Sequence, residues 1–415
     1  MREFVVGYVR RDYAVQRNVL AAAPGCSYVQ LHDWSRTLAA AARRCNGFLG
    51  REFFEAHDRA HEFRARWDCP RVDVQHLFNQ ISYGKRPWIS SFETALPRFR
   101  CCMDDHHGER VHACMPVAAR ARHRARAISA LAGNSCKRLL ALSNCAAAIQ
   151  HFQLRDAPLQ RDAIARKLTI LHPPQACLLE DVAAKPAAPG GVLRLMFVGS
   201  SFFRKGGMEL LETLCTLVQE QRFQVQLTLV SDLRTDSYAC SGSHGARARA
   251  RQLIAANRSW ISHYERLDNA DVLRLMLNAD IGVLPTYADT YGYSVLEFQS
   301  TGCPVISTDV RALPEINDDS RGWLIQVPKN SMGEALHDSA TGRARISAAI
   351  RAGLESVLQQ IRARPELVRQ KARRALQQLR LSHDPGRFGE RLLEIYADCT
   401  AARSGTPTAP LTMAS

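Results

Sequence analysis

Residues 279–308 read ADIGVLPTYADTYGYSVLEFQSTGCPVIST, and this stretch decides the fold. A short apolar run ends at Pro285, a polar loop follows, and a helical segment begins near Ser294. Gly302-Cys-Pro304 then leads into a second apolar run. The order strand, loop, helix, strand is typical of a parallel α/β sheet, in which ligands bind at the loops that follow the strands.

The same alternation of strands and helices is predicted over the rest of the C-terminal half. Apolar and β-branched runs predict six strands, at 193–199, 225–231, 261–264, 281–285, 305–307 and 323–327. Apolar residues at helical spacing predict helices at 208–219, 271–279, 294–300 and 346–360. Six strands with helices between them predict a complete doubly wound domain.

The N-terminal half shows a looser version of this pattern. Strands are expected at 4–9, 72–77, 88–92, 139–143 and 168–171, with helical Ala/Arg-rich stretches such as 35–44 and 118–131. Residues 183–191, rich in Pro, Gly and Ala, predict an interdomain linker. The expected organisation is an N-terminal domain (1–182), this linker, a C-terminal domain (192–364), C-terminal helices (365–402) and a disordered tail (403–415).

Composition narrows the class of protein. The chain has 415 residues, 46% hydrophobic and 23% charged, which excludes disordered, collagenous and coiled-coil classes. No apolar run approaches the ~18–20 residues of a membrane span, and the N-terminus does not resemble a signal peptide, so a soluble cytoplasmic protein is expected. The net charge of +15 is compatible with an anionic partner, although only seven of the 55 basic residues are lysine and an arginine-rich composition explains the charge equally well.

Thirteen scattered cysteines with no C-x-x-C pair favour reduced thiols over a disulfide framework. The densest group of cysteine, histidine and aspartate lies between Cys101 and Cys114. Its residue types suit zinc, but its spacing fits no standard zinc template. We expect a solvated loop there and no metal site.

The first chemically suggestive segment is LMFVGSSFFRKGG, residues 195–207. A strand, Gly199, the adjacent cations Arg204 and Lys205, and two further glycines before a helix suit a diphosphate. Glycines allow close approach of the backbone, a helix start offers N–H groups, and the cations neutralise charge.

The second segment carries two carboxylates, Asp289 in a loop and Glu297 in the following helix. A carboxylate that accepts hydrogen bonds from vicinal hydroxyls suits a ribose or hexose. Two interpretations stay open for each: Ser294-Val-Leu-Glu297 is also a capping box, and Asp289 also suits an ordinary turn.

Taken together, these segments resemble the C-terminal domain of GT-B glycosyltransferases, most closely the retaining family 4 group. The resemblance spans about 193–324 and rests on five motifs in order, at 199–206, 271–285, 289–297, 302–306 and 313–315. It implies two Rossmann-like domains facing each other across a cleft, with C-terminal helices. The N-terminal half matches more loosely, through 143–146 and 170–174.

The resemblance also implies roles for individual residues. Arg204 and Lys205, with Gly199, would bind the diphosphate of a nucleotide-sugar donor, and Glu297 its ribose. The backbone around Gly292, Tyr293 and Ser294 would face the sugar and phosphates.

Two positions depart from the family pattern. Asp289 stands at the first acidic position of the E-x7-E motif, where it would contact the transferred sugar with a shorter side chain. Glu93 stands where the family often has a histidine, so it is a candidate sugar or acceptor contact, or a loop carboxylate paired with Arg98 or Arg100. His32-Asp33 could point into the cleft, but a structural role is favoured.

The implied reaction moves a sugar from a nucleotide diphosphate to a hydroxyl of a saccharide or glycolipid, with retention at the anomeric carbon. No D-x-D triplet occurs, so neither a metal nor another cofactor is expected. Alternatives, in decreasing order, are a degenerate protein that binds a nucleotide sugar without turnover, a nucleotide-sugar epimerase and a nucleic-acid-binding protein. No nucleic-acid module supports the last of these.

The acceptor is not readable from the residues. A basic N-terminal domain would suit an anionic membrane surface, and Arg122, Arg124 and Arg126 are the predicted contacts. The expected location is therefore cytoplasmic, with peripheral association at the inner face of a membrane.

Overall fold

The computed structural model describes residues 4–10, 19–51, 53–100, 102–103, 117–186, 191–235, 239 and 244–401. It divides into two compact units. Unit 1 comprises Met1–Pro174 with Pro385–Ser415, and unit 2 comprises Gln175–Asp384. Each unit contains a six-stranded sheet, which confirms the predicted α/β class.

Unit 2 is built on a fully parallel sheet in the order β11-β10-β9-β12-β13-β14. The strands are β9 (Leu193–Val198), β10 (Val225–Val230), β11 (Ile261–Tyr264), β12 (Ile281–Leu284), β13 (Val305–Thr308) and β14 (Trp323–Ile325). All six predicted strands are confirmed. The order places the first strand of the unit, β9, beside the fourth, β12, so the loops that leave these two strands lie at the topological switch point.

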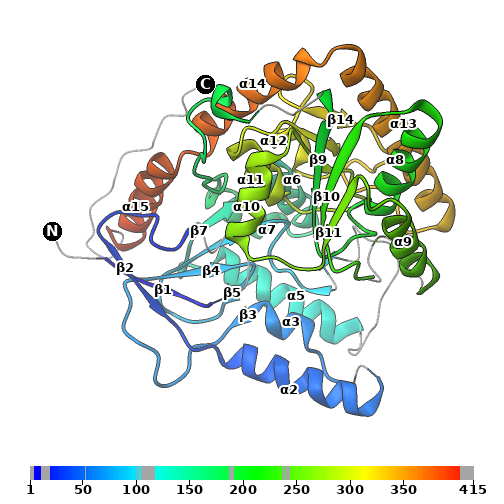
Figure 1. Cartoon of the computed structure of the whole chain (residues 1–415). Helices are drawn as coiled ribbons and strands as arrows, with labels where there is room; N and C mark the ends of the chain where they lie inside the picture. Colours follow the sequence, from blue (N-terminus) through cyan, green and yellow to red (C-terminus); the bar gives the residue numbers. More distant parts are fainter. Residues whose placement is uncertain are drawn as a thin grey trace. The chain divides into compact units, whose positions relative to one another are not determined.

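Helices cover both faces of this sheet. They are α8 (Gly207–Gln221), α9 (His244–Ala256), α10 (Asn269–Asn278), α11 (Tyr293–Ser300), α12 (Leu313–Ile316), α13 (Ala340–Ala363) and α14 (Glu366–Ser382). Figure 1 shows α8, α9 and α13 on one side of the strands and α10 and α11 on the other. The four helices predicted here are confirmed; α9 was missed because its sequence, HGARARARQLIAA, has a weak apolar period.

Unit 1 contains a second parallel sheet, in the order β2-β1-β4-β6-β7-β8. Its strands are β1 (Phe4–Tyr8), β2 (Cys26–Gln30), β4 (Val74–Phe78), β6 (Trp88–Phe92), β7 (Cys136–Ala141) and β8 (Leu168–Ile170), and β3 (Glu62–Phe63) pairs with β5 (Ile81–Ser82). The five predicted strands are present. β2 was not predicted because it is a partly exposed edge strand without a continuous apolar run.

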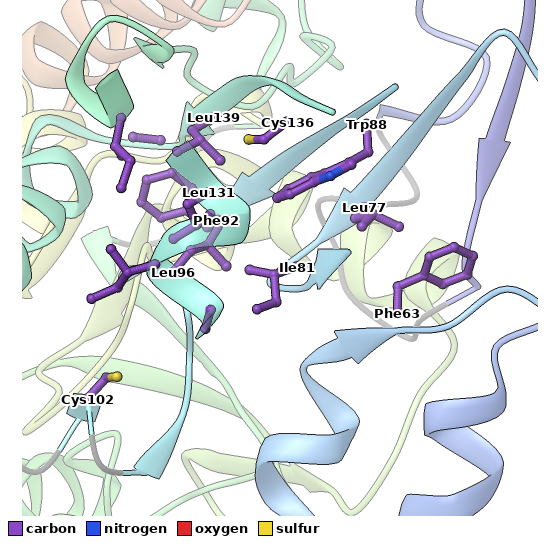
Figure 2. Close-up of a cluster of buried hydrophobic side chains, with 14 of the residues drawn as sticks. Phe63, Leu77, Ile81, Trp88, Phe92, Leu96, Cys102, Leu131, Cys136 and Leu139 are labelled. Carbon is purple, nitrogen blue, oxygen red and sulfur yellow. The ribbon is translucent and has the colours of Figure 1, made fainter. Parts of the chain in front are cut away.

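The helices of unit 1 surround a dense core. They are α2 (Trp34–Leu49), α3 (His57–Ala60), α5 (Val117–Ala132), α6 (Asn144–Gln153), α7 (Pro158–Ala165) and α15 (Pro385–Ala401). Figure 2 shows the core around Trp88 and Phe92 of β6, which are fully buried with Leu77, Ile81 and Leu96.

The C-terminal helix α15 belongs to unit 1, where it packs against β4 and β7. The Tyr396 hydroxyl lies 2.7 Å from His76 Nδ1, and His76 Nε2 lies 2.8 Å from Ser91 Oγ. Burial lowers the pKa of His76 to about 3, so the imidazole is neutral at physiological pH. A buried polar cluster therefore joins α15 to the central strands β4 and β6.

The division between the units differs from the predicted linker. The chain passes between units at 174–175 and 384–385. Residues 182–184 form a short 3-10 turn inside unit 2, and Lys185 Nζ donates to the Thr301 carbonyl at 2.9 Å and to Cys303 Sγ at 2.8 Å. The prediction that residues 183–191 link two domains was wrong, because this segment lies within unit 2, where Lys185 is anchored. Residues 187–190 lie outside the described residues.

Two further predicted segments lie mostly or wholly outside the described residues: the tail 403–415, and the cysteine–histidine segment, of which Cys102 is described and buried. Within the described ranges, no group of three His, Cys, Asp or Glu side chains could hold a metal ion. No helix in those ranges is long and apolar enough to cross a membrane.

One buried carboxyl in unit 1 predicts a pH-dependent stability. Asp58 lies beside Glu55, Glu62 and His123, and burial raises the pKa of Asp58 to about 7. In the unfolded chain this carboxyl releases its proton near pH 4, whereas the folded chain keeps it up to about pH 7. The free energy of unfolding is therefore expected to fall as pH rises between these values.

Substitution Asp58→Asn is expected to flatten this part of the stability–pH curve, because the substituted side chain does not titrate. Its amide oxygen can still accept the Arg100 N–H, which lies 2.8 Å from Asp58 Oδ1 in the wild type. Thermal unfolding across the pH range measures the slope. Asp162→Asn, at an exposed carboxylate, is the control and should keep the wild-type slope. An unchanged slope in Asp58→Asn would contradict the prediction.

Candidate functional site

The candidate site forms where the loops after β9 and β12 meet. The Tyr287 N–H donates to the Arg204 carbonyl at 2.8 Å, and Thr286 Oγ1 donates to the same carbonyl at 3.2 Å. Gly206, with φ +74°, lies so close to Pro285 that an added Cβ would be 2.0 Å from the Pro285 carbonyl oxygen. The two loops therefore form one backbone-to-backbone contact at the switch point.

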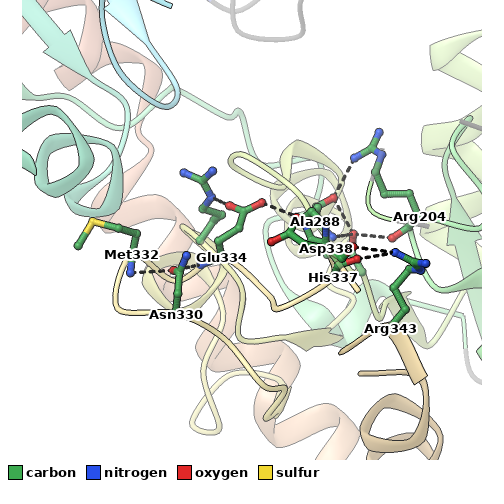
Figure 3. A network of polar contacts seen from close by, with 10 residues as sticks. Arg204, Ala288, Asn330, Met332, Glu334, His337, Asp338 and Arg343 are labelled. Atoms are coloured by element: carbon green, nitrogen blue, oxygen red, sulfur yellow. Dashed lines mark hydrogen bonds and ion pairs between the residues drawn. The ribbon is translucent and has the colours of Figure 1, made fainter. Parts of the chain in front are cut away.

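Arg204 is fixed across this contact. Its Nη1 donates to the Ala288 carbonyl at 2.8 Å (Figure 3). Its Nη2 donates to Ser201 Oγ at 2.9 Å. Ser201 was not singled out from the sequence. These bonds hold the guanidinium between the two loops, where its charge can act on a ligand.

Lys205 is paired with Asp289. Lys205 Nζ lies 3.6 Å from Asp289 Oδ2, and both side chains are largely buried. The lysine stem crosses Gly199, where an added Cβ would be 2.4 Å from Lys205 Cδ. Gly199 is thus needed to let the lysine lie in this position.

Asp289 also begins the next helix. Its Oδ1 accepts the Gly292 N–H at 3.1 Å, and Gly292, with φ +91°, is the N-cap of α11. One carboxylate therefore links the cation of the first loop to the helix start of the second. An ordinary turn interpretation accounts for the Gly292 bond but not for the ion pair.

The capping-box interpretation of Ser294 and Glu297 was wrong. The helix begins at Tyr293, with Gly292 as its cap and no side-chain capping bond, so Ser294 is already inside the first turn. Ser294 Oγ is buried and has no hydrogen-bond partner in the described part of the chain. Glu297 lies one turn further on and is partly buried.

The start of α8 differs from expectation. The N–H groups of Lys205, Gly206 and Gly207 donate to the carbonyls of Ser201, Phe203 and Phe202. These amides are used inside the loop because the chain turns tightly before α8. The loop therefore offers a ligand its two cations rather than these three backbone donors, while α11 supplies a helix N-terminus.

A second layer of polar contacts, not predicted from the sequence, supports the loops of unit 2. Glu209 of α8 accepts the Tyr287 hydroxyl at 2.6 Å and the Ser347 hydroxyl at 2.8 Å. After β13, buried Arg311 pairs with Glu334, whose Oε1 lies 3.3 Å from His337 Nε2 (Figure 3). Tyr287 and Ser347 lie 78 and 138 positions from Glu209, and Arg311 lies 23 positions from Glu334, so no spacing rule could have found these three contacts. His337 is only three residues from Glu334.

In unit 1, two predicted residues occupy loops that follow strands. Glu93 follows β6 and is buried, and its N–H donates at 3.1 Å to Asn79 Oδ1 in the loop after β4. Asp33 caps α2 through Ser35 N–H and accepts Gln80 Nε2, both at 3.0 Å, which confirms its structural role. The predicted catalytic pair, Asp289 and Glu93, thus lies in different units.

Part of this chain is similar to a known protein family. Residues 193–340 match the family model described as glycosyl transferases group 1. The matched segment, hereafter the group 1 domain, lies within unit 2. The group 1 domain contains every predicted donor residue: Gly199, Arg204, Lys205, Gly292, Tyr293, Ser294 and Glu297.

A curated relative of the group 1 domain is the D-inositol 3-phosphate glycosyltransferase of Arthrobacter sp. (strain FB24), 26% identical over 167 residues. The match covers 39% of this chain and 38% of the relative's own length.

Solved structures extend the likeness to the whole fold. WaaG, a glycosyltransferase involved in lipopolysaccharide biosynthesis, is 17% identical with a TM-score of 0.56, over 95% of this chain and 99% of its own. Anabaena HepE in complex with UDP-glucose is 11% identical with a TM-score of 0.52, over 95% and 99%. The group 1 domain is thus part of a GT-B fold, as predicted.

Proposed function

We propose that this protein is a glycosyltransferase that moves a sugar from a nucleotide diphosphate to a hydroxyl of a saccharide or glycolipid, with retention of anomeric configuration. The observation that carries this proposal is the meeting of Arg204, Lys205, Asp289 and the α11 N-terminus at the β9–β12 switch point. Two fixed cations and a helix start form a diphosphate site without further rearrangement.

The proposed reaction breaks the bond between the anomeric carbon and the diphosphate oxygen and forms a bond to the acceptor oxygen on the same face. The acceptor proton passes to the departing diphosphate. Arg204 and Lys205 stabilise the charge that develops on the leaving group. Gly199 lets Lys205 approach, and Gly292, Tyr293 and Ser294 face the sugar and phosphates.

The remaining assignments concern carboxylates. We assign Glu297 to the ribose of the donor. We assign Asp289 to the transferred sugar, with a second task of holding Lys205 in place, which its 3.6 Å ion pair supports. Glu93 is our candidate for a sugar or acceptor contact from unit 1, supported by its place after β6.

The donor class is a nucleotide-diphosphate sugar. HepE, which shares the fold, has been solved with UDP-glucose, and this supports the donor class without fixing the base here. We propose that no metal or other cofactor takes part, because Arg204, Lys205 and the α11 N-terminus already oppose the diphosphate charge. We place the enzyme in the cytoplasm, at the inner face of a membrane that carries its acceptor.

The test is a thermal-shift panel of UDP-, GDP-, ADP- and TDP-sugars with wild type and Glu297→Ala. One base class is expected to raise the Tm of wild type, and the shift should be lost in Glu297→Ala because the ribose contact is gone. Glu220→Ala, at an exposed glutamate of α8, is the matched control and should keep the shift. If no donor raised the Tm of wild type, the proposed function would be contradicted. If Glu297→Ala showed the same shift as wild type, the assignment of Glu297 to the ribose would be contradicted.

A further inference from the structure

Helix α2 of unit 1 has one buried face of small side chains and a second, apolar face that is exposed. Ser35, Ala39 and Ala42 form the buried stripe, made of small side chains. The second stripe follows helical spacing and is exposed; its members are Trp34, Leu38, Ala41, Cys45 and Phe48. A helix that leaves large apolar side chains in water at regular spacing has a face suited to another apolar phase.

The turn after α2 extends this exposed face. Asn46 Oδ1 accepts the N–H groups of Phe53 and Phe54 at 3.0 and 2.8 Å, and Asn46 Nδ2 donates to the Phe54 carbonyl at 2.8 Å. These bonds fold the turn back onto the end of the helix. The Phe48 side chain is 92% exposed and the Phe53 side chain 58% exposed. The hydrogen bonds from Asn46 therefore fix a turn whose aromatic rings face solvent.

The charged residues of α2 and of the turn up to Arg51 are all basic, whereas Asp68, which pairs with Arg66 at 3.3 Å, lies beside Trp67. Residues 34–51 contain no aspartate or glutamate and four arginines, which are Arg36, Arg43, Arg44 and Arg51. The Arg51 guanidinium lies 5.7 Å from the Phe53 ring centre. Arg66 lies 5.3 Å from the Trp34 ring, and the neighbouring Trp67 is 87% exposed.

We propose that this surface, hereafter the α2 surface, docks unit 1 onto an anionic lipid bilayer. The α2 surface comprises Trp34, Leu38, Phe48, Leu49, Phe53, Phe54 and Trp67 with the arginines named above. Exposed Phe and Trp side chains bury their rings at the headgroup boundary, and arginines pair with lipid phosphates. Complementary charge favours an anionic bilayer over a neutral one.

The α2 surface replaces the membrane contact expected on α5. Arg124 donates to the Gln153 carbonyl at 2.8 Å and lies 3.9 Å from Asp156, and Arg126 stacks over Tyr83 at 4.3 Å. Two of the three predicted arginines are therefore engaged within unit 1. The proposal rests on the membrane location given under the proposed function and names the surface that makes the contact. Its test needs neither a sugar donor nor an acceptor.

The test is co-sedimentation of the full chain with vesicles of phosphatidylcholine alone and of phosphatidylcholine mixed with phosphatidylglycerol. Wild type should bind the mixed vesicles, with a blue shift of tryptophan emission. The double variant Phe48→Ser, Phe53→Ser should bind at least about tenfold more weakly, because two aromatic rings no longer leave water. Arg43→Glu with Arg44→Glu should also bind about tenfold more weakly.

Matched controls come from α7, outside the α2 surface. Leu159 is 89% exposed and Arg161 is exposed, so Leu159→Ser and Arg161→Glu should bind vesicles like wild type. Since all substituted side chains are exposed, an unchanged Tm would show that the variants fold.

Equal binding of the α2 variants and wild type would overturn the proposal, as would failure of wild type to bind the anionic vesicles. A third outcome would also overturn the proposal: wild type does not bind vesicles but self-associates, and the Phe48→Ser, Phe53→Ser variant does not self-associate. That result would assign the α2 surface to contact with a second copy of the chain. A normal donor-induced Tm shift in the α2 variants would show that the donor site is intact, so that failure of the membrane proposal is distinguished from failure of the proposed function.

Discussion

Replacing Lys205 with alanine is expected to lower kcat/KM for sugar transfer by about 10²–10³-fold, the typical effect of removing one fixed group that stabilises developing charge. Lys205 is held beside Asp289 and over Gly199, so its charge is in place before a donor arrives. The loss should appear in kcat more than in KM, since charge on the leaving group grows in the transition state. Steady-state kinetics with the donor found by thermal shift measure both constants.

A double-mutant cycle tests whether Asp289 acts through Lys205. If the Asp289 carboxylate serves mainly to hold Lys205, Asp289→Asn should lower kcat/KM only slightly in a chain that already carries Lys205→Ala. Additive losses would assign Asp289 a separate contact with the sugar. Lys85→Ala, at an exposed lysine of unit 1, is the control and should keep wild-type kinetics. Unchanged kinetics in Lys205→Ala would contradict the proposed diphosphate site.

Replacing Gly206 with alanine is expected to damage both stability and donor binding. A side chain at φ +74° costs about 1–2 kcal/mol. The new Cβ would also lie 2.0 Å from the Pro285 carbonyl oxygen, and overpacking of this kind typically costs about 1–3 kcal/mol more. Because the obstacle is backbone, the β9 and β12 loops must separate, which would displace Arg204 from Ala288.

Gly191→Ala provides a matched control. Gly191 has φ +73°, nearly the value of Gly206, but no atom of the described residues lies within 4 Å of an added Cβ. It should show the conformational cost alone and keep the donor-induced Tm shift. Urea unfolding measures the stability difference between the two variants. Equal losses in both would show that contact with Pro285 does not govern the site.

Much of the fold was predictable because buried parallel strands leave a strong signal. The runs at β9, β10 and β12 are apolar and bounded by turn residues, so their positions follow from the sequence alone. The edge strand β2 gives no such signal, since its residues are partly exposed. Helix α9 alternates Ala and Arg, a pattern that composition bias produces as readily as a helix does.

The site was predictable only in part. The glycines and cations of the β9 loop stand in one short segment, so their proximity could be read directly. The bond from Tyr287 to Glu209 joins residues 78 positions apart, and only the folded chain reveals it. The capping box failed for a different reason: Gly292 adopts φ +91° and begins the helix earlier, which a side-chain pattern does not encode.

The return of α15 to unit 1 has a consequence for biosynthesis. Unit 2 is continuous from 175 to 384, and its two ends meet where the Gln175 N–H donates to the His383 carbonyl at 2.8 Å. As the nascent chain leaves the ribosome, unit 2 can fold as soon as its own residues have emerged. Unit 1 cannot complete its fold until α15 has been synthesised. The strands of unit 1 and the helix that completes it are therefore separated in time by the synthesis of a whole domain. We expect nascent chains arrested before Pro385 to contain a folded unit 2 and an open β4–β7 face, a substrate for chaperones until α15 has been made.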